Sequence, residues 1–267
     1  MNICLIGNSK RTEILYNNLI GKGYSVDIFR ATEEIPNRIS AEWVILPIPT
    51  TIDKNHLNLE GKKLTVHEII DRTNKDATII SCNYSCNSHI NYDVNKHELF
   101  TYLNAIPTAE GAIEIAIRES EKSLAYSKAL ITGFGHVGKI LADRLKGLFG
   151  SVTIAARSEK DLSYAQGLGF DTVNIYELSE NINKFDIIFQ TVPSMVIDSK
   201  VIENMNEGSF IIELSSGSVG TDHQFANKVG LKVVHAPALP TKVAPKTAGD
   251  ILTKSVLSII AKGNSFD

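Results

Sequence analysis

Three glycines, Gly133, Gly135 and Gly138, form the pattern G-x-G-x-x-G within the stretch "ALITGFGHVGKILADRLKGLFG". An apolar run precedes them, and residues 139–149 have the character of a helix. In this setting the first glycine permits a tight turn, the second lets a pyrophosphate approach the backbone, and the third lets helix and strand pack closely. The stretch therefore predicts a dinucleotide-binding turn. Its predicted cofactor contacts are Gly133, Phe134, Gly135, His136, Val137 and Gly138.

A cation, Arg157, stands where such turns usually lead to an Asp or Glu that binds a ribose 2′-hydroxyl. A guanidinium has only donors, so it cannot accept a hydrogen bond from that hydroxyl. It can make paired hydrogen bonds to a 2′-phosphate and stack on adenine, and Ser158 adds a hydroxyl donor. The pair predicts NADP rather than NAD as the cofactor. The alternative is a solvated surface arginine.

Small and polar residues follow two later strands of the same region. Thr191, Val192 and Pro193 come after the fourth strand and are expected to line the nucleotide cleft. Ser215 and Ser216 come after the fifth strand and are expected to face the nicotinamide.

A proline-rich loop, residues 235–249, follows the sixth strand. Its Lys242, Lys246 and Thr247 bring cations and a hydroxyl to the start of a helix, which is a favourable place for a carboxylate. The alternative is that Lys246 only solvates the helix start. His235 is either a general base or a histidine of the core. No Ser-His-Asp or Cys-His arrangement indicates hydrolysis.

The composition narrows the class of protein. With 267 residues, 43% hydrophobic and 21% charged, the chain resembles an ordinary globular protein of two domains. The net charge of −3 without a basic block argues against nucleic-acid binding. No apolar run approaches the roughly 20 residues that span a bilayer. Three cysteines are too few for a disulfide scaffold, so we expect a cytoplasmic protein. Cys82, Cys86 and His89 lack a fourth ligand, so no metal is expected.

Apolar runs alternate with helical segments along the whole chain, which predicts an α/β fold with two Rossmann-like domains, doubly wound parallel sheets and the cofactor site in the second. Residues 2–29 look like a distant copy of the glycine region, but Ser9 and Thr12 replace its glycines, so this copy is expected to bind no nucleotide. We expect a catalytic substrate domain over residues 1–125, with helix 246–267 packing back onto it. The cofactor domain is then residues 126–245.

Strands are predicted at 42–48, 77–82 and 98–103 in the first domain, and a helix capped by Thr108 is predicted to join the domains. Those predicted in the second domain are 130–132, 152–155, 172–175, 186–190, 210–214 and 232–235.

Several segments, in this order along the chain, resemble the A component of the dipicolinate synthase family. They are "NAIPTAEGAIEIAI", "ITGFGHVGK", "TIAARS", "TVPSMVIDSKVI", "IIELSSGSVGTD" and "APALPTKVAPKTAGDIL". The family is similar in layout to D-2-hydroxyacid and alanine dehydrogenases. The resemblance implies oxidation of dihydrodipicolinate to spore dipicolinate during sporulation, with NADP accepting hydride. It also implies a heteromer with a flavoprotein-like B component, and a homo-oligomer is expected.

On this resemblance, Lys246, Thr247, Asn104 and Thr108 are expected to clamp the two carboxylates of a small dicarboxylate substrate. Two places depart from the family pattern: Val219-Gly220 replaces a Gly-Gly pair, and Ala238 and Thr241 replace glycines of a Gly-Leu-Pro-Gly run. Two alternatives therefore remain. One is a paralogous NADP-dependent dehydrogenase of another small imino, keto or hydroxy acid. The other is a non-catalytic NADP-binding protein that works within a larger assembly.

Overall fold

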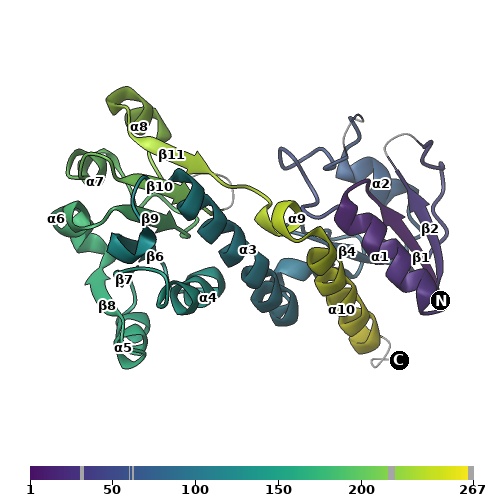
Figure 1. The fold of residues 1–267 in the computed structure, drawn as a ribbon. Helices are drawn as coiled ribbons and strands as arrows, with labels where there is room; N and C mark the ends of the chain where they lie inside the picture. Colours follow the sequence, from purple (N-terminus) through teal and green to yellow (C-terminus); the bar gives the residue numbers. More distant parts are fainter. Residues whose placement is uncertain (31–32, 60, 62, 216–219, 264–267) are drawn as a thin grey trace. The chain divides into compact units, whose positions relative to one another are not determined.

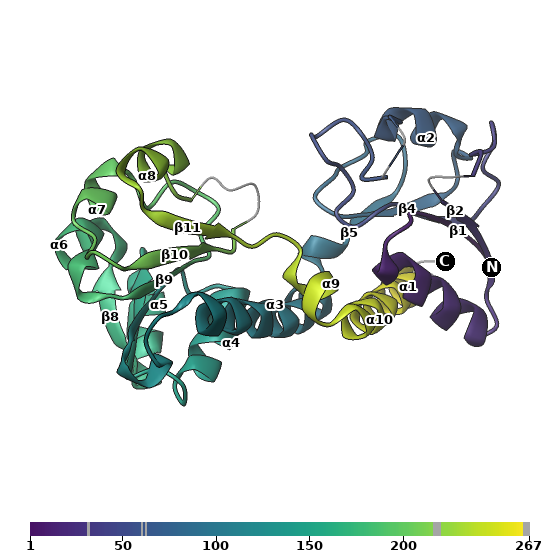
Figure 2. The same cartoon turned by 45° about the horizontal axis from the view of Figure 1, so that its top comes forward.

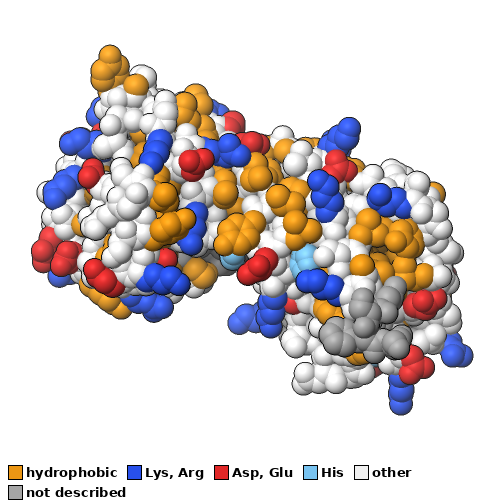
Figure 3. Space-filling model, turned by 90° about the horizontal axis from the view of Figure 1, so that it is seen from below, with side chains coloured by type: hydrophobic (Ala, Val, Ile, Leu, Met, Phe, Trp, Pro, Cys, Tyr) orange, Lys and Arg blue, Asp and Glu red, His pale blue; other side chains and the backbone are white. Residues whose placement is uncertain are grey.

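The chain forms two compact units. The computed structural model describes residues 1–30, 33–59, 61, 63–215 and 220–263. Unit 1 consists of Met1–Asn104 together with Ala244–Asp267, and unit 2 is Ala105–Val243. Among the described residues, every helix is too short or too polar to cross a bilayer. On the face drawn in Figure 3, acidic and basic side chains are interspersed with apolar ones.

Unit 2 contains a six-stranded sheet in the order β11-β10-β9-β6-β7-β8, with every neighbouring pair parallel. This is the doubly wound order, in which the chain reverses direction between β6 and β9. All the strands predicted for this region are present. Their bounds are β6 (Lys128–Thr132), β7 (Ser151–Ala156), β8 (Asp171–Asn174), β9 (Ile187–Gln190), β10 (Phe210–Glu213) and β11 (Lys232–His235).

Helices cover both faces of this sheet because successive strand residues point to opposite sides. Ile131 and Phe189 pack with residues of α3 and α4, whereas their neighbours Leu130 and Ile188 pack with residues of α6, α7 and α8. The helices are α3 (Glu98–Glu119), α4 (His136–Leu145), α5 (Glu159–Gly167), α6 (Leu178–Asn181), α7 (Ser199–Glu203), α8 (His223–Val229) and α9 (Leu239–Val243). Short 3₁₀ turns occupy Val94–Lys96, Leu124–Tyr126, Ile175–Glu177 and Ile182–Lys184.

Unit 1 contains a five-stranded parallel sheet in the order β2-β1-β3-β4-β5. Its strands are β1 (Asn2–Ile6), β2 (Ser25–Phe29), β3 (Trp43–Ile45), β4 (Thr78–Ser81) and β5 (Asn91–Asp93), and its helices are α1 (Lys10–Gly21), α2 (Val66–Arg72) and α10 (Pro245–Gly263). The last helix, α10, lies beside α1 on one face of the sheet (Figures 1 and 2). There Val256 and Ile259 share a core with Leu5 and Leu15.

The segment predicted as a strand at 98–103 is instead the start of α3, so that prediction is wrong. Thr108 lies inside this helix and is not its N-cap. The physical reason is the spacing of the buried side chains, since Phe100, Ala105, Ala109 and Ala112 fall on one helical face. The helix passes through Pro107 and leads from unit 1 into unit 2. The compact units therefore divide at Asn104, before the expected boundary at residue 125.

Candidate dinucleotide site

The glycine turn between β6 and α4 is tightly packed at two of its three glycines. Gly133 has φ of +87°, and a Cβ atom there would lie 2.8 Å from Val192 and 2.9 Å from Thr191. A Cβ atom on Gly138 would lie 2.3 Å from the carbonyl oxygen of Gly133. At Gly135, by contrast, no atom lies within 4 Å of that position. The first and third glycines are thus required by packing, whereas the second leaves space for a ligand.

The N-terminus of α4 has no side chain that satisfies its backbone N–H groups. Gly135 is the N-cap residue and offers no side-chain oxygen, and the first turn holds no acidic residue. The first N–H groups of a helix lack partners within it, and together with the helix dipole they attract an anion. The residues present therefore fit the pyrophosphate of a dinucleotide.

The three other residues predicted in this turn are placed differently from one another. The Phe134 side chain is 3% exposed and packs edge-on against Phe170, with ring centroids 6.3 Å apart. It belongs to the core of unit 2, so only its backbone can face a ligand. His136 and Val137 form the first turn of α4, and His136 is exposed.

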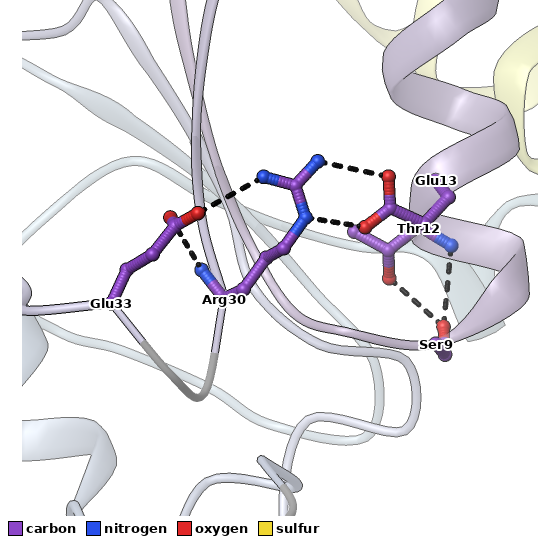
Figure 4. A network of polar contacts seen from close by, with 5 residues as sticks. All are labelled: Ser9, Thr12, Glu13, Arg30 and Glu33. Carbon is purple, nitrogen blue, oxygen red and sulfur yellow. Dashed lines mark hydrogen bonds and ion pairs between the residues drawn. The ribbon is translucent and has the colours of Figure 1, made fainter.

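The matching turn in unit 1 is closed by its own side chains. Ser9 is the N-cap of α1 and accepts a 3.2 Å hydrogen bond from the backbone N–H of Thr12. The Ser9 and Thr12 hydroxyls also hydrogen-bond to each other at 2.9 Å, as Figure 4 shows. A Cβ atom on Gly7 would lie 2.8 Å from the Thr12 hydroxyl. The space that a pyrophosphate needs is therefore filled, which supports a cofactor site in unit 2 alone.

Arg157 and Ser158 follow β7 directly, and both are exposed. Within the described residues, no carboxylate or carbonyl group accepts a hydrogen bond from Arg157, and Ser158 is the N-cap of α5 without a capping bond from its side chain. Both side chains are therefore available to a phosphate.

Arg30, which follows β2 in unit 1, is in the opposite situation. It makes hydrogen bonds of 2.7 and 3.0 Å to the carboxylate of Glu13 and one of 3.2 Å to that of Glu33 (Figure 4). The hydrogen bond to Glu13 is the main reason that the pKa of Arg30 is raised. An arginine beyond the second strand of each unit thus has two different states, one neutralised by carboxylates and one accessible.

The residues predicted after β9 are held by backbone contacts. Thr191 donates a 2.6 Å hydrogen bond from its hydroxyl to the carbonyl oxygen of Thr132 at the end of β6. Thr191 and Val192 are partly buried, and Pro193 is exposed. This places residues 191–193 next to the glycine turn, at the carboxyl edge of the sheet where ligands of doubly wound folds bind.

Gln190 is a residue of this edge that the sequence did not reveal. It is fully buried, and its side chain donates a 2.8 Å bond to the carbonyl of Val192 and accepts a 2.6 Å bond from the backbone N–H of the same residue. It also accepts a 2.8 Å bond from the Thr132 hydroxyl. A Cβ atom on Gly220 would lie 1.3 Å from its Nε2 atom. Gln190 therefore fixes the ends of β6 and β9, and Gly220 makes room for it.

A buried carboxylate, Glu213, organises the end of β10. The hydroxyl of Thr221 donates a 2.6 Å hydrogen bond to it, the hydroxyl of Ser215 donates a second, and His223 Nε2 lies 3.9 Å away. Ser215 is therefore buried with its hydroxyl turned to Glu213. Ser216, also predicted to face the nicotinamide, lies outside the described residues, as does Val219.

The four residues predicted to clamp the substrate are divided between the units. Lys246 and Thr247 lie in the first turn of α10 in unit 1, and both are exposed. Asn104 also belongs to unit 1 and accepts a 3.2 Å hydrogen bond from Arg11. Thr108 belongs to unit 2 and is partly buried. The clamp remains a proposal. Arg11 was missed, although it shares the spacing of the buried Leu15 and Leu19, a position where a charged residue is unusual.

A cavity of about 710 Å³ lies elsewhere in unit 2, against residues that begin β9, β10 and β11. Its charged groups already pair with each other, because Lys122 contacts Asp186 and Lys232 contacts Glu119, each at 2.9 Å. It is also at the amino ends of the strands, whereas doubly wound folds bind nucleotides at the carboxyl ends. We therefore do not assign the cofactor to it.

The described part of the chain contains no cluster of His, Cys, Asp and Glu side chains that could hold a metal ion. Cys82 is buried, while His89 Nε2 contacts the carbonyl oxygen of Asn74 at 3.1 Å.

The strand order, the glycine turn and the uncapped helix define an α/β protein with a dinucleotide-binding domain of the dehydrogenase type. Residues 108–237 match the D-isomer specific 2-hydroxyacid dehydrogenase, NAD binding domain. The chain is a homologue of the A component of dipicolinate synthase. It is 35% identical over 159 residues to that protein from Bacillus subtilis (strain 168), and the alignment covers 60% of this chain but only 54% of the relative.

Two solved structures are similar over nearly their whole length. The dipicolinate synthase A chain from Bacillus subtilis has a TM-score of 0.86 and 26% identity, covering 100% of this chain and 98% of that one. The corresponding component of dipicolinate synthase from Bacillus halodurans has a TM-score of 0.86 and 23% identity, covering 97% of each chain. Their fold is the fold of this chain.

Proposed function

We propose that this chain is an NADP-dependent oxidoreductase that oxidises dihydrodipicolinate to pyridine-2,6-dicarboxylate, as the A component of a dipicolinate synthase active in sporulation. The observation that carries the proposal is the open N-terminus of α4, where Gly135 leaves both the space and the N–H groups that a pyrophosphate needs. The homology to dipicolinate synthase supports the choice of substrate.

The cofactor would be held by the glycine turn at its pyrophosphate and by residues 191–193 along its length. Arg157 and Ser158 would bind the 2′-phosphate, because a guanidinium makes paired charge-assisted hydrogen bonds to phosphate oxygens. Bound NADP+ would supply the acceptor for the hydride that leaves the dihydropyridine ring. Gln190 and Glu213 would keep the surrounding strand ends in place, since both are buried and hydrogen-bonded to the residues that follow.

The side chains that face the substrate would mainly bind and orient it. Loss of a hydride to the cofactor and of a proton to solvent makes the ring aromatic, which supplies driving force. Lys246 and Thr247 would hold carboxylate oxygens at the N-terminus of α10, together with Asn104 and Thr108. The relative from Bacillus subtilis is named as one part of a synthase, which supports a second component as partner. We propose that this partner is flavoprotein-like and that the chain also forms a homo-oligomer.

The proposal is tested by mixing the chain with NADP+ and dihydrodipicolinate generated by an enzyme in the same cuvette. We expect NADPH absorbance to rise and pyridine-2,6-dicarboxylate to accumulate in equal amount. The reaction is repeated with NAD+ in place of NADP+, and with the B component of a dipicolinate synthase added. No formation of NADPH under any of these conditions would contradict the proposal.

A second candidate is an NADP-dependent dehydrogenase of another small imino, keto or hydroxy acid. Ala238 favours it, because this residue has φ of +57°, in a conformation suited to the glycine that the family pattern carries there. A side chain at this position changes the loop that precedes α9. NADPH formation with such an acid, and none with dihydrodipicolinate, would select this candidate. Tight NADPH binding without turnover of any acid would indicate a non-catalytic role.

A further inference from the structure

Arg11 is a buried cation without a counter-ion. It lies in the first turn of α1 and is 6% exposed. Its only side-chain hydrogen bond within the described residues runs from Nη2 to Oδ1 of Asn104, at 3.2 Å. Its Nε atom is buried and has no hydrogen-bond partner. No described Asp or Glu forms an ion pair with it, so several of its donors remain unused.

The groups around Arg11 do not neutralise its charge. The guanidinium carbon lies 5.9 Å from the centre of the Phe100 ring, which gives a weak attraction to the ring face. The other interacting group is the thiol of Cys82. Burial, assisted by the charge of Asp93, raises the pKa of Cys82 to about 12, so the thiol is neutral at physiological pH. Burial also lowers the pKa of Arg11 itself.

Arg30 in the same unit shows what a compensated arginine looks like, because it bonds to the carboxylates of Glu13 and Glu33 (Figure 4). A buried charge is costly unless it is paired and hydrogen-bonded. The helix dipole of α1 adds further positive potential at Arg11. Both features favour an anion that comes from outside the chain.

The shape of the donor group indicates which anion. A guanidinium presents a planar fork that matches the two oxygens of a carboxylate. The pyrophosphate of a nucleotide is disfavoured here, because Ser9 and Thr12 fill the turn before α1. Burial of Arg11 admits only a small group.

We infer that Arg11 binds a carboxylate of the substrate and that Asn104 positions its guanidinium. The choice of a small dicarboxylate as ligand rests on the proposed function. The site lies within unit 1 and is separate from the dinucleotide turn of unit 2. It gives unit 1 the role of holding the acid, and it explains why a charged residue occupies the buried stripe of α1.

The test is a calorimetric titration of the full chain with pyridine-2,6-dicarboxylate, in parallel with inorganic phosphate. Arg11→Met should weaken dicarboxylate binding by about 10–150-fold, the range for losing one charge-assisted hydrogen bond. Arg30→Met is the matched control and should leave the dissociation constant unchanged. NADPH binding should be the same in all variants.

A second variant, Asn104→Asp, decides the matter if Arg11→Met does not fold. It places a carboxylate where Oδ1 already meets Arg11, so it should compete with the ligand and weaken dicarboxylate binding by at least about 10-fold. Its urea midpoint should rise, because the buried cation gains a counter-ion.

Unchanged dicarboxylate binding in the folded variants would overturn the inference, as would tighter binding of phosphate than of dicarboxylate. Loss of binding in these variants, combined with no turnover of dihydrodipicolinate by the natural chain, would contradict the proposed function and leave the carboxylate site standing.

Discussion

The carbonyl oxygen of Gly133 lies 2.3 Å from the position that a Cβ atom on Gly138 would occupy. The start of α4 therefore touches the end of β6 with no room for any side chain. Gly135 lies between these two residues in the sequence, yet its Cβ position is open. One turn thus contains a glycine required by packing and another whose absence of a side chain matters only to a ligand.

This difference predicts opposite effects for two alanine substitutions. Gly138→Ala forces backbone atoms apart and should lower the free energy of unfolding by about 1–3 kcal/mol. Gly135→Ala should change stability by less than about 1 kcal/mol, but its methyl group should obstruct the pyrophosphate and weaken NADPH binding. Urea unfolding and NADPH fluorescence titration measure the two effects. Normal NADPH affinity in Gly135→Ala would show that no pyrophosphate binds at this turn.

Arg157→Asp should reverse the preference between NADPH and NADH. The change removes paired hydrogen bonds to a 2′-phosphate and adds repulsion, so NADPH affinity should fall by about 10–150-fold. NADH affinity should not fall, since the new carboxylate can accept a hydrogen bond from a 2′-hydroxyl. Dissociation constants for both cofactors are compared in the natural chain and the variant. An unchanged ratio would identify Arg157 as a surface residue without a role in binding.

Glu213→Leu should destabilise unit 2. The hydroxyls of Ser215 and Thr221 both donate to this carboxylate, and both would lose their acceptor in a buried place. The expected loss is about 1–3 kcal/mol for each unsatisfied group. Glu213→Gln is the matched control, because its amide oxygen can still accept one of these bonds, and it should lose less. Equal stability of the leucine and glutamine variants by urea unfolding would argue against this network.

Ala238→Gly should stabilise the chain. Ala238 has φ of +57°, in the left-handed region that costs a residue with a Cβ atom about 1–2 kcal/mol. Glycine removes that cost but adds freedom to the unfolded chain, so we expect a net gain of about 0.5–1 kcal/mol. Ala236→Gly provides the comparison, because Ala236 is buried and outside this region of φ, and it should lower stability. A lower thermal midpoint for Ala238→Gly would contradict the prediction.

The cysteines should differ in reactivity and should make stability depend on pH. Burial raises the pKa values of Cys4 and Cys82 from 9.0 to about 12, whereas Cys86 is partly exposed. A thiol reagent should label Cys86 in the native protein and spare the other two. In the unfolded chain these thiols ionise near 9.0, so their contribution to stability should be present below that pH and lost as pH rises toward about 12. A rise in stability over this range, or rapid labelling of a Cys86→Ser variant, would contradict this.

Much of unit 2 follows from local sequence patterns. Apolar runs separated by helical segments predicted its strands, and the three glycines predicted the turn before α4. The segment at 98–103 shows the limit of such patterns. Its Phe, Thr and Tyr residues favour a strand, but Phe100 and the alanines after it share one buried helical face, so tertiary packing decides for α3.

The sequence by itself determined where the backbone could turn and which segments could form strands, because glycine conformation and apolar spacing are local properties. Only the tertiary structure decided which charges are compensated. Arg11, Arg30 and Arg157 are the same residue type, yet one is buried without a carboxylate, one is paired with two, and one is exposed. The partners of a charge and its distance from water depend on residues remote in sequence, so no local pattern distinguishes the three.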